Sequence, residues 1–137
     1  LRLKGPRRAP AVIGNEQLLR HALINLLRNA FQATPRGGTV TVRLEHLASR
    51  GCVLIRVSDT GTGIPPHCRL RLFTGAVTTK GPHGVGLGLL FTHRIITETH
   101  GGRIWFRTRE GVGTTFYIQL PVAPGLPAEG GPPAAPG

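Results

Sequence analysis

Thiols are scarce in this chain of 137 residues, which carries two cysteines. Cys52 and Cys68 are too few for a disulfide framework, and neither stands in a CxxC metal-binding pattern. We therefore expect a protein of a reducing compartment, the cytosol being the simplest choice. Long apolar runs are missing too, since no stretch could span a bilayer and no signal peptide is evident at the start. The chain begins with leucine instead of methionine, so we expect a piece of a longer protein.

Acidic residues are also few, six against seventeen lysines and arginines, which gives a net charge of +11. Such a charge favours polyanionic partners, whether nucleotide phosphates, nucleic acid or an acidic protein surface. Aromatic residues make up 5% of the chain and the arginines are scattered along it. Neither a basic helix nor a strand with interleaved aromatic and arginine residues is therefore clear, and nucleic acid is not an expected partner.

Hydrophobic periodicity predicts one domain in the order strand, helix, hairpin, loop, helix, hairpin. We expect helices over 16–33 and 87–99, a short helix over 68–73, and strands over 39–47, 53–57, 103–109 and 114–120. Asn15 is the predicted N-cap of the first helix, with Glu16 in its first turn. This order favours an α+β fold of two layers, in which a mixed, mostly antiparallel sheet carries its helices on one face.

Three regions are expected along the chain. Residues 1–14 are predicted to be a basic linker with a brief edge strand at 11–13. Residues 15–121 are predicted to form the folded domain. Residues 122–137 contain little besides Pro, Gly and Ala, and we expect them to be a disordered tail.

The only aspartate of the chain, Asp59, follows a branched apolar run and precedes Gly61 and Gly63. A strand buried on both faces would direct this carboxylate into a crevice. Glycines at alternate positions would let the backbone approach a flat ligand. An ordinary Asp-x-Gly turn explains the same residues, so the segment alone does not decide between the two.

Two further segments suit a phosphate-bearing ligand. A glycine-rich stretch at 84–88 opens the predicted second long helix, whose unpaired amides and dipole attract anions. It matches neither the dinucleotide fingerprint nor the Walker A motif. Asn25 and Asn29 lie one turn apart on the first helix, where an amide oxygen could share Mg²⁺ with substrate phosphates. A pair of exposed polar residues is the alternative.

In order and spacing, these motifs resemble those of sensor histidine kinases. The N box is matched by the stretch from His21 to Ala30, the G1 box by Asp59-Thr-Gly-Thr-Gly63-Ile, and the G2 box by Gly84-Val-Gly-Leu-Gly88-Leu. Leu72-Phe73 and Thr78-Thr-Lys80 resemble the F box and ATP lid, although Thr-Gly-Ala-Val follows Phe73 where the family often has a second aromatic. The resemblance covers about residues 15–121 and also includes the closing hairpin.

The resemblance implies the Bergerat, or GHKL, fold with ATP and Mg²⁺ as cofactors. Asp59 would accept a hydrogen bond from the adenine amino group, and Thr114 would support Asp59 through its hydroxyl. Asn29 would hold Mg²⁺, and Asn25, Asn29 and Lys80 would form the catalytic set. The full set of implied ATP-binding residues is Asn25, Asn29, Asp59, Gly61, Gly63, Ile64, Lys80, Gly84, Val85, Gly86, Leu87, Gly88 and Thr114.

The implied activity is transfer of the γ-phosphoryl group of ATP to a histidine on a separate dimerisation domain. None of the six histidines is followed by an acidic residue, so we expect the acceptor upstream of Leu1. A homodimeric protein and a response regulator partner are implied, with a cytoplasmic location, either free or as the cytosolic part of a membrane-bound sensor. Relatives that hydrolyse ATP carry a Glu base where Asn25 stands, so direct hydrolysis should be slow. A non-catalytic nucleotide-sensing module is the alternative, and an arginine-rich binder of nucleic acid or acidic proteins is a third hypothesis.

Overall fold

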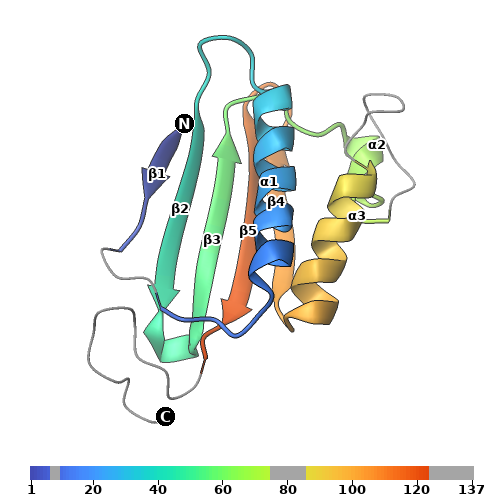
Figure 1. Cartoon of the computed structure of the whole chain (residues 1–137). Coiled ribbons are helices and arrows are strands. Elements are labelled where there is room, and N and C mark those ends of the chain that lie inside the picture. The colour runs from blue at the N-terminus through green and yellow to red at the C-terminus, as the bar shows by residue number, and fades with distance from the viewer. Residues whose placement is uncertain (7–9, 75–85, 124–137) are drawn as a thin grey trace.

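One mixed sheet is the central element of the domain (Figure 1). The computed structural model describes residues 1–6, 10–74 and 86–123. The strands lie in the order β1-β2-β3-β5-β4. Their bounds are β1 Arg2–Lys4, β2 Val40–Leu47, β3 Cys52–Asp59, β4 Arg103–Arg109 and β5 Gly113–Pro121. The β1–β2 pair is parallel and the other three pairs are antiparallel.

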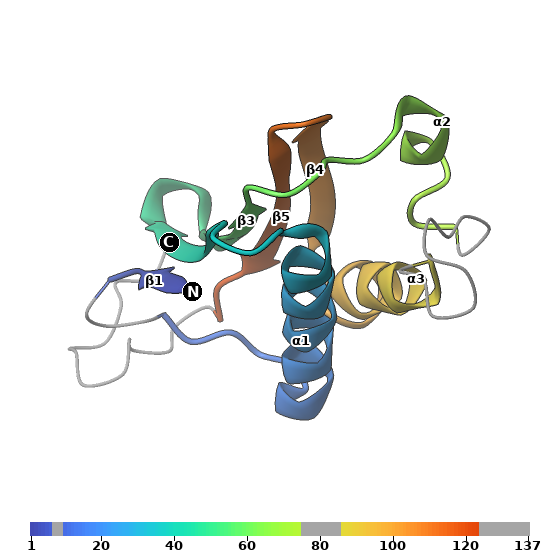
Figure 2. The same cartoon turned by 90° about the horizontal axis from the view of Figure 1, so that it is seen from above.

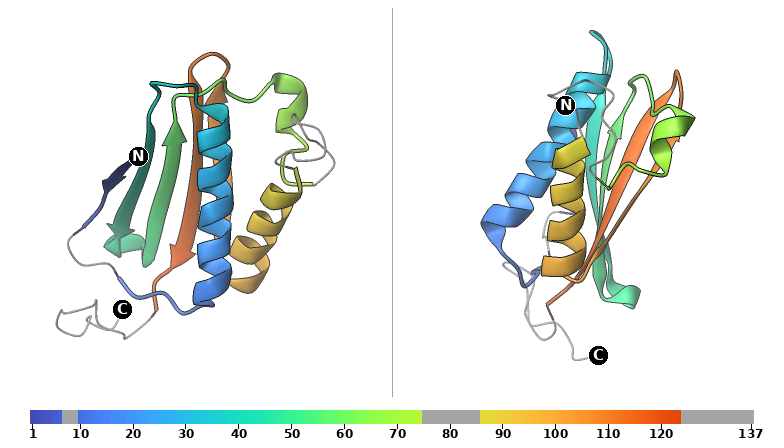
Figure 3. Two further views of the ribbon diagram at one scale, coloured as in Figure 1. Left: turned by 45° about the horizontal axis from the view of Figure 1, so that its top comes forward. Right: turned by 90° about the vertical axis from the view of Figure 1, so that its right-hand side faces the viewer.

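Two long helical segments cover one face of this sheet and leave the other face open (Figures 2 and 3). They are α1 (Glu16–Ala33) and α3 (Gly86–Arg94), which continues into a π-helical turn, η3 (Ile95–Thr99). The short helix α2 (Pro66–Arg69) and the 3₁₀ turn η1 (Ala48–Arg50) complete the described elements. The predicted two-layer α+β architecture is confirmed. Among the described helices, none is both long enough and apolar enough to cross a membrane.

The first helix has the bounds that its sequence predicts. Asn15 caps it, because its Oδ1 accepts a hydrogen bond from the Leu18 N–H at 3.0 Å. The residues that it buries fully are Ala22, Leu26 and Ala30, which recur every fourth position and face the sheet. The neighbouring leucines Leu19, Leu23 and Leu27 are only partly buried.

The second long helical segment also spans the expected residues, 87–99. Thr92 is fully buried and its hydroxyl donates to the Gly88 carbonyl at 2.8 Å. Ile95 and Ile96 are buried as well, three and four residues after Thr92, which is the spacing of one helical face. Gly101 then ends the segment in the left-handed conformation, with φ of +64°.

Three local predictions need correction. The edge strand is β1 and not residues 11–13, where Ala11 instead accepts a single backbone hydrogen bond from Ala123 at 2.8 Å. The short helix, predicted at 68–73, spans Pro66–Arg69 instead. Proline suits this start, because the first N–H groups of a helix have no acceptor within the helix. Val122 and Ala123, which were predicted to belong to the disordered tail, are instead paired with the domain, since the Val122 N–H bonds the Gly51 carbonyl at 2.9 Å. Residues 124–137 lie outside the described part.

Candidate functional site

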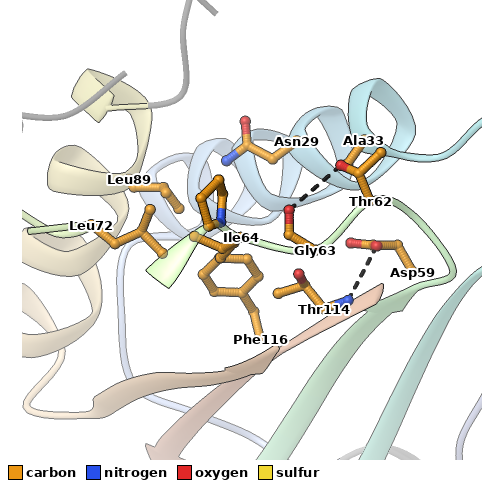
Figure 4. Close-up of a pocket in the computed structure, with 11 residues that line it drawn as sticks. Asn29, Ala33, Asp59, Thr62, Gly63, Ile64, Leu72, Leu89, Thr114 and Phe116 are labelled. Carbon is orange, nitrogen blue, oxygen red and sulfur yellow. Dashed lines mark hydrogen bonds between the residues drawn. The ribbon is translucent and has the colours of Figure 1, made fainter. Parts of the chain in front are cut away.

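A pocket of about 80 Å³ opens beside the end of β3, beneath the last turns of α1 (Figure 4). Its wall is mostly apolar, with one carboxylate and one carboxamide. The residues that line it are Asn29, Ala33, Asp59, Thr62, Gly63, Ile64, Pro65, Leu72, Leu89, Thr114 and Phe116. Asp59, Asn29, Gly63, Ile64 and Thr114, which the sequence singles out as site residues, thus meet around one cavity.

The carboxylate of Asp59 is held in place by backbone donors. Its Oδ1 accepts hydrogen bonds from the Gly61 N–H at 2.9 Å and from the Thr114 N–H at 3.3 Å. One of these donors follows β3 and the other lies on the neighbouring strand β5, directly opposite Asp59 in the sheet register. The carboxylate therefore has a fixed orientation at the edge of the pocket before any ligand binds.

The loop that follows β3 is fixed from three sides. Thr60 N–H bonds the Thr39 carbonyl at 3.1 Å, and Thr62 N–H bonds the Ala33 carbonyl, at the end of α1, at 3.2 Å. On the third side, the Ile64 N–H donates to the hydroxyl of a threonine in β4, Thr108, at 2.9 Å. These contacts fix residues 60–64, which form the floor of the pocket, to the sheet and to α1, so the apolar wall is preformed.

Gly61 and Gly63 are also required by contacts within the protein, a role that the sequence did not indicate. A Cβ on Gly61 would collide with the carbonyl of Ala33, and Gly61 itself does not line the pocket. Gly63 has φ of +77°, and a Cβ there would lie 2.5 Å from the carbonyl oxygen of Arg109. The two glycines thus let the loop pack between α1 and the β4–β5 hairpin.

Thr114 supports Asp59 through a different group from the one expected. Its backbone N–H is the donor to Asp59, whereas its hydroxyl lies 2.8 Å from the Thr108 hydroxyl. Thr114 is buried and Thr108 half-buried. Because the Thr108 hydroxyl also receives the Ile64 N–H, this threonine pair connects Asp59 with the pocket floor.

Asn29 presents a polar group that lacks a partner. Its Nδ2 is buried and makes no hydrogen bond within the described residues. A half turn about the Cβ–Cγ bond would place its oxygen there instead, so the position can serve a donor or an acceptor. No cluster of three or more His, Cys, Asp or Glu in the described part of the chain could hold a metal ion. A metal here would need Asn29 together with oxygens of a bound ligand, which is the arrangement that Mg²⁺ commonly adopts.

Asn25 faces the start of α3. A Cβ on Gly88 would lie 3.7 Å from its Cγ and Oδ1, so the side chain lies against the glycine-rich helix start. Gly86 and Leu87 begin the described part of α3. Lys80, Gly84 and Val85, with the rest of the predicted lid, lie outside the described residues.

The far wall of the pocket is supported by aromatic packing. Phe73 contacts the rings of His93, Phe106 and Phe116 at centroid distances of 5.2, 5.8 and 6.3 Å. The residue before it, Leu72, is buried and lines the pocket. The F-box pair is thus part of the core despite the missing second aromatic.

Thr62, Leu89 and Phe116 also line the pocket, although the sequence did not mark them as site residues. Phe116 carried a usable signal, because it lies on the inward face of an alternating strand, two residues beyond Thr114. Leu89 had one as well, since it directly follows the glycine-rich stretch. Thr62 stands between two glycines and had no signal of its own.

Known proteins resemble this chain in sequence and in fold. Residues 14–124 match the sequence profile of the family described as histidine kinase-, DNA gyrase B-, and HSP90-like ATPase. The adaptive-response sensory kinase SasA of Rippkaea orientalis is 39% identical over 120 residues, which are 85% of this chain and 30% of SasA. SasA of Synechococcus elongatus is 38% identical over 120 residues, with the same coverage. The chain therefore spans about a third of the length of these curated relatives.

Solved structures agree with these relatives. The catalytic domain of histidine kinase ThkA, in a nucleotide-free form, has a TM-score of 0.77 and 31% identity, and the match covers 89% of this chain and 79% of that one. The mycobacterial sensor histidine kinase MprB has a TM-score of 0.76 and 30% identity, with coverage of 90% and 84%. The chain belongs to the family of histidine kinase-, DNA gyrase B- and HSP90-like ATPases, as an ATP-binding domain of the histidine kinase type.

Proposed function

We propose that this chain is the catalytic domain of a two-component sensor histidine kinase, which passes the γ-phosphoryl group of ATP to a histidine on a separate dimerisation domain. The observation that carries the proposal is that one pocket is lined by both the fixed carboxylate of Asp59 and the Asn29 side chain, whose buried Nδ2 has no partner among the described residues. One end of this pocket suits a purine and the other suits phosphates.

The Asp59 end would bind the adenine ring. A carboxylate that already accepts two backbone N–H groups is held rigidly and can accept a further donor, such as the exocyclic amino group of adenine. Guanine presents a carbonyl oxygen at the equivalent position, so two acceptors would face each other and guanine would be rejected. Ile64 and Phe116 supply apolar surface for the faces of the ring.

The Asn29 end would meet the phosphates. When bound, Mg²⁺ would neutralise charge on the phosphate oxygens during transfer. For its part, the chain would supply the Asn29 carboxamide oxygen, with Asn25 beside it at the start of α3. The start of α3 would add a favourable helix dipole for the phosphates. Lys80 would add positive charge as a third catalytic residue.

Asn25 also bears on the reaction that follows. A carboxamide cannot take a proton from water, so this position offers no general base for hydrolysis. A domain that binds and positions ATP without activating water preserves the phosphoryl group for an acceptor histidine. The proposal therefore includes a dimerisation domain with that histidine, a homodimeric kinase, and a response regulator that receives the phosphoryl group. We place the domain in the cytoplasm, where ATP is available, within a cytoplasmic kinase or the cytosolic part of a membrane-bound sensor.

The proposal is tested by adding γ-labelled ATP and Mg²⁺ to this domain together with the histidine-bearing dimerisation domain of the same kinase. Acid-labile, base-stable label should appear on the acceptor histidine, and the Asp59→Asn variant should transfer far less. ATP binding without any label on the acceptor would contradict the kinase activity and would instead support a nucleotide-sensing module. Absence of ATP binding would contradict both.

A further inference from the structure

The face of the sheet opposite to α1 and α3 carries a continuous row of cations and aromatic rings. Lys4, Arg43 and Arg56 are direct neighbours across β1, β2 and β3, and Tyr117 and Trp105 continue the same row across β5 and β4. Because alternate residues such as Val57 and Phe116 face the helices, this row points to the open side. The row thus extends across the whole width of the sheet.

The two flanking rows add more positive charge. Arg2 and Arg107 lie in the row on one side, and Arg103 lies in the row on the other side. Within these rows of the described sheet, Glu45 is the one acidic residue, and it forms an ion pair with Arg56 at 3.1 Å. Six cations therefore face a single carboxylate, and much of the net charge of the chain is concentrated here.

The arginines are held in place by the two rings. Trp105 and Tyr117 stack with centroids 5.2 Å apart and ring planes within 2° of each other. The guanidinium carbons of Arg56 and Arg107 lie 5.8 and 6.0 Å from the Tyr117 centroid, and that of Arg103 lies 5.9 Å from the Trp105 ring. Guanidinium groups stacked in this way lose less conformational entropy when they bind a ligand.

Such an arrangement does not favour the isolated domain. Arg43 and Arg56 are directly opposite each other on adjacent strands, and like charges in that relation are destabilising. In addition, Arg56 Nε is buried and makes no hydrogen bond with any described residue. A negatively charged partner would relieve the repulsion between Arg43 and Arg56.

We infer that this open sheet face, defined by Arg43, Arg56, Arg103, Arg107, Trp105 and Tyr117, docks an acidic segment of a partner protein. Planar guanidinium groups pair with carboxylates through two parallel hydrogen bonds, which fits aspartate and glutamate side chains. The inference goes beyond the proposed kinase function, because the nucleotide pocket lies on the helix-covered side and uses none of these residues.

The rings argue for protein against two other polyanions. A single-stranded nucleic acid would stack its bases on exposed ring faces, but Trp105 and Tyr117 already cover each other and are flanked by arginines. A surface that binds an anionic membrane commonly inserts apolar side chains into it as well, and none of the large exposed apolar residues belongs to these rows. The carboxylates of an acidic peptide need only the outward-facing N–H groups of the arginines.

The test is fluorescence anisotropy of the full chain with a labelled peptide of alternating Asp and Glu at low and physiological salt. The face variant Arg43→Gln/Arg107→Gln is compared with the control variant Arg28→Gln/Arg94→Gln, which removes the same charge from exposed positions on α1 and α3. We expect about tenfold or more weaker binding for the face variant and less than about threefold for the control, because direct charged hydrogen bonds outweigh screened long-range attraction.

Equal losses in the two variants, or no loss in the face variant, would overturn the inference. Tighter binding of oligothymidylate or phosphatidylserine vesicles than of the peptide, with the same dependence on the face, would overturn the assignment to a protein partner. ATP affinity serves as a separate readout and should be equal in both variants, so failure of the docking surface is distinguishable from failure of the proposed kinase. The melting temperature should not fall in the face variant, since Arg43→Gln removes a like-charge pair.

Discussion

Replacing Asp59 with Asn tests the purine end of the pocket with almost no change in shape. In the wild-type protein, Asp59 Oδ1 accepts the Gly61 and Thr114 N–H groups. The oxygen of Asn can accept the same two donors, so the loop should keep its conformation. The side-chain nitrogen must then point where the second carboxylate oxygen was, and it would meet the amino group of adenine donor to donor.

The expected cost follows from the loss of one charge-assisted hydrogen bond, about 1.5–3 kcal/mol. This corresponds to a loss of about 10- to 150-fold in affinity. Calorimetric titration should show it equally for ATP and for adenosine, because the contact is to the base. Discrimination against GTP should also shrink, since the new N–H can donate to the guanine carbonyl oxygen.

Unfolding by urea provides the control for Asp59→Asn. The free energy of unfolding should change by less than about 1 kcal/mol, because both backbone hydrogen bonds persist. Unchanged ATP affinity in a variant of unchanged stability would refute the assignment of Asp59 to the adenine ring. A loss for ATP but not for adenosine would move Asp59 to the phosphate end and would refute it equally.

Three further substitutions test other parts of the structure. Asn29→Ala should abolish the Mg²⁺-dependent part of ATP binding while adenosine affinity stays the same, and persistence of Mg²⁺ dependence in calorimetry would contradict its role. Gly63→Ala should lower the free energy of unfolding by more than Gly37→Ala does. Both glycines have positive φ (+77° and +88°), so each variant is strained, but only at Gly63 would the new Cβ collide with backbone atoms. Gly37→Ala should cost about 1–2 kcal/mol, and equal losses in urea unfolding would contradict the packing argument. His100→Ala should lower the free energy of unfolding by about 1–3 kcal/mol, because the ring bonds the Asn15 N–H at the start of α1 at 2.9 Å and the Ile95 carbonyl in η3 at 2.8 Å. Substitution of the exposed His21 by Ala is the control, and equal stability of the two variants would contradict this link.

The elements with strong local signals were predictable from sequence. Both bounds of α1 were foreseen, because Asn15 bonds a residue in its own first turn and the buried positions recur at helical spacing. The hairpin strands β4 and β5 were foreseen because their inward residues alternate. In each case the deciding interaction lies within a few residues or follows a simple period.

What sequence did not reveal depends on contacts between distant segments. The short strand β1 exists only through pairing with β2, so Arg2–Lys4 alone carries no distinguishing pattern. Likewise, Gly61 and Gly63 are needed for contacts with Ala33 and Arg109, which no local spacing could show.

The candidate site was predicted in part for the same reason. Asp59 and Asn29 were identified by residue type and motif, and the structure brings both to one pocket. The support for Asp59 by the Thr114 amide, and the threonine pair that connects it to the pocket floor, required the β3–β5 and β4–β5 registers. The open sheet face is the most nonlocal feature, since its arginines come from three strands and are scattered in sequence.

The most direct test of the shared pocket is amide chemical-shift mapping by NMR during titration with Mg²⁺ and a non-hydrolysable ATP analogue. The largest shifts should fall on Gly61, Ile64 and Thr114 around the base and on Asn29 and Gly88 around the phosphates, in one saturable step. Shifts confined to another surface, or two independent steps for the two groups of residues, would contradict a single nucleotide site.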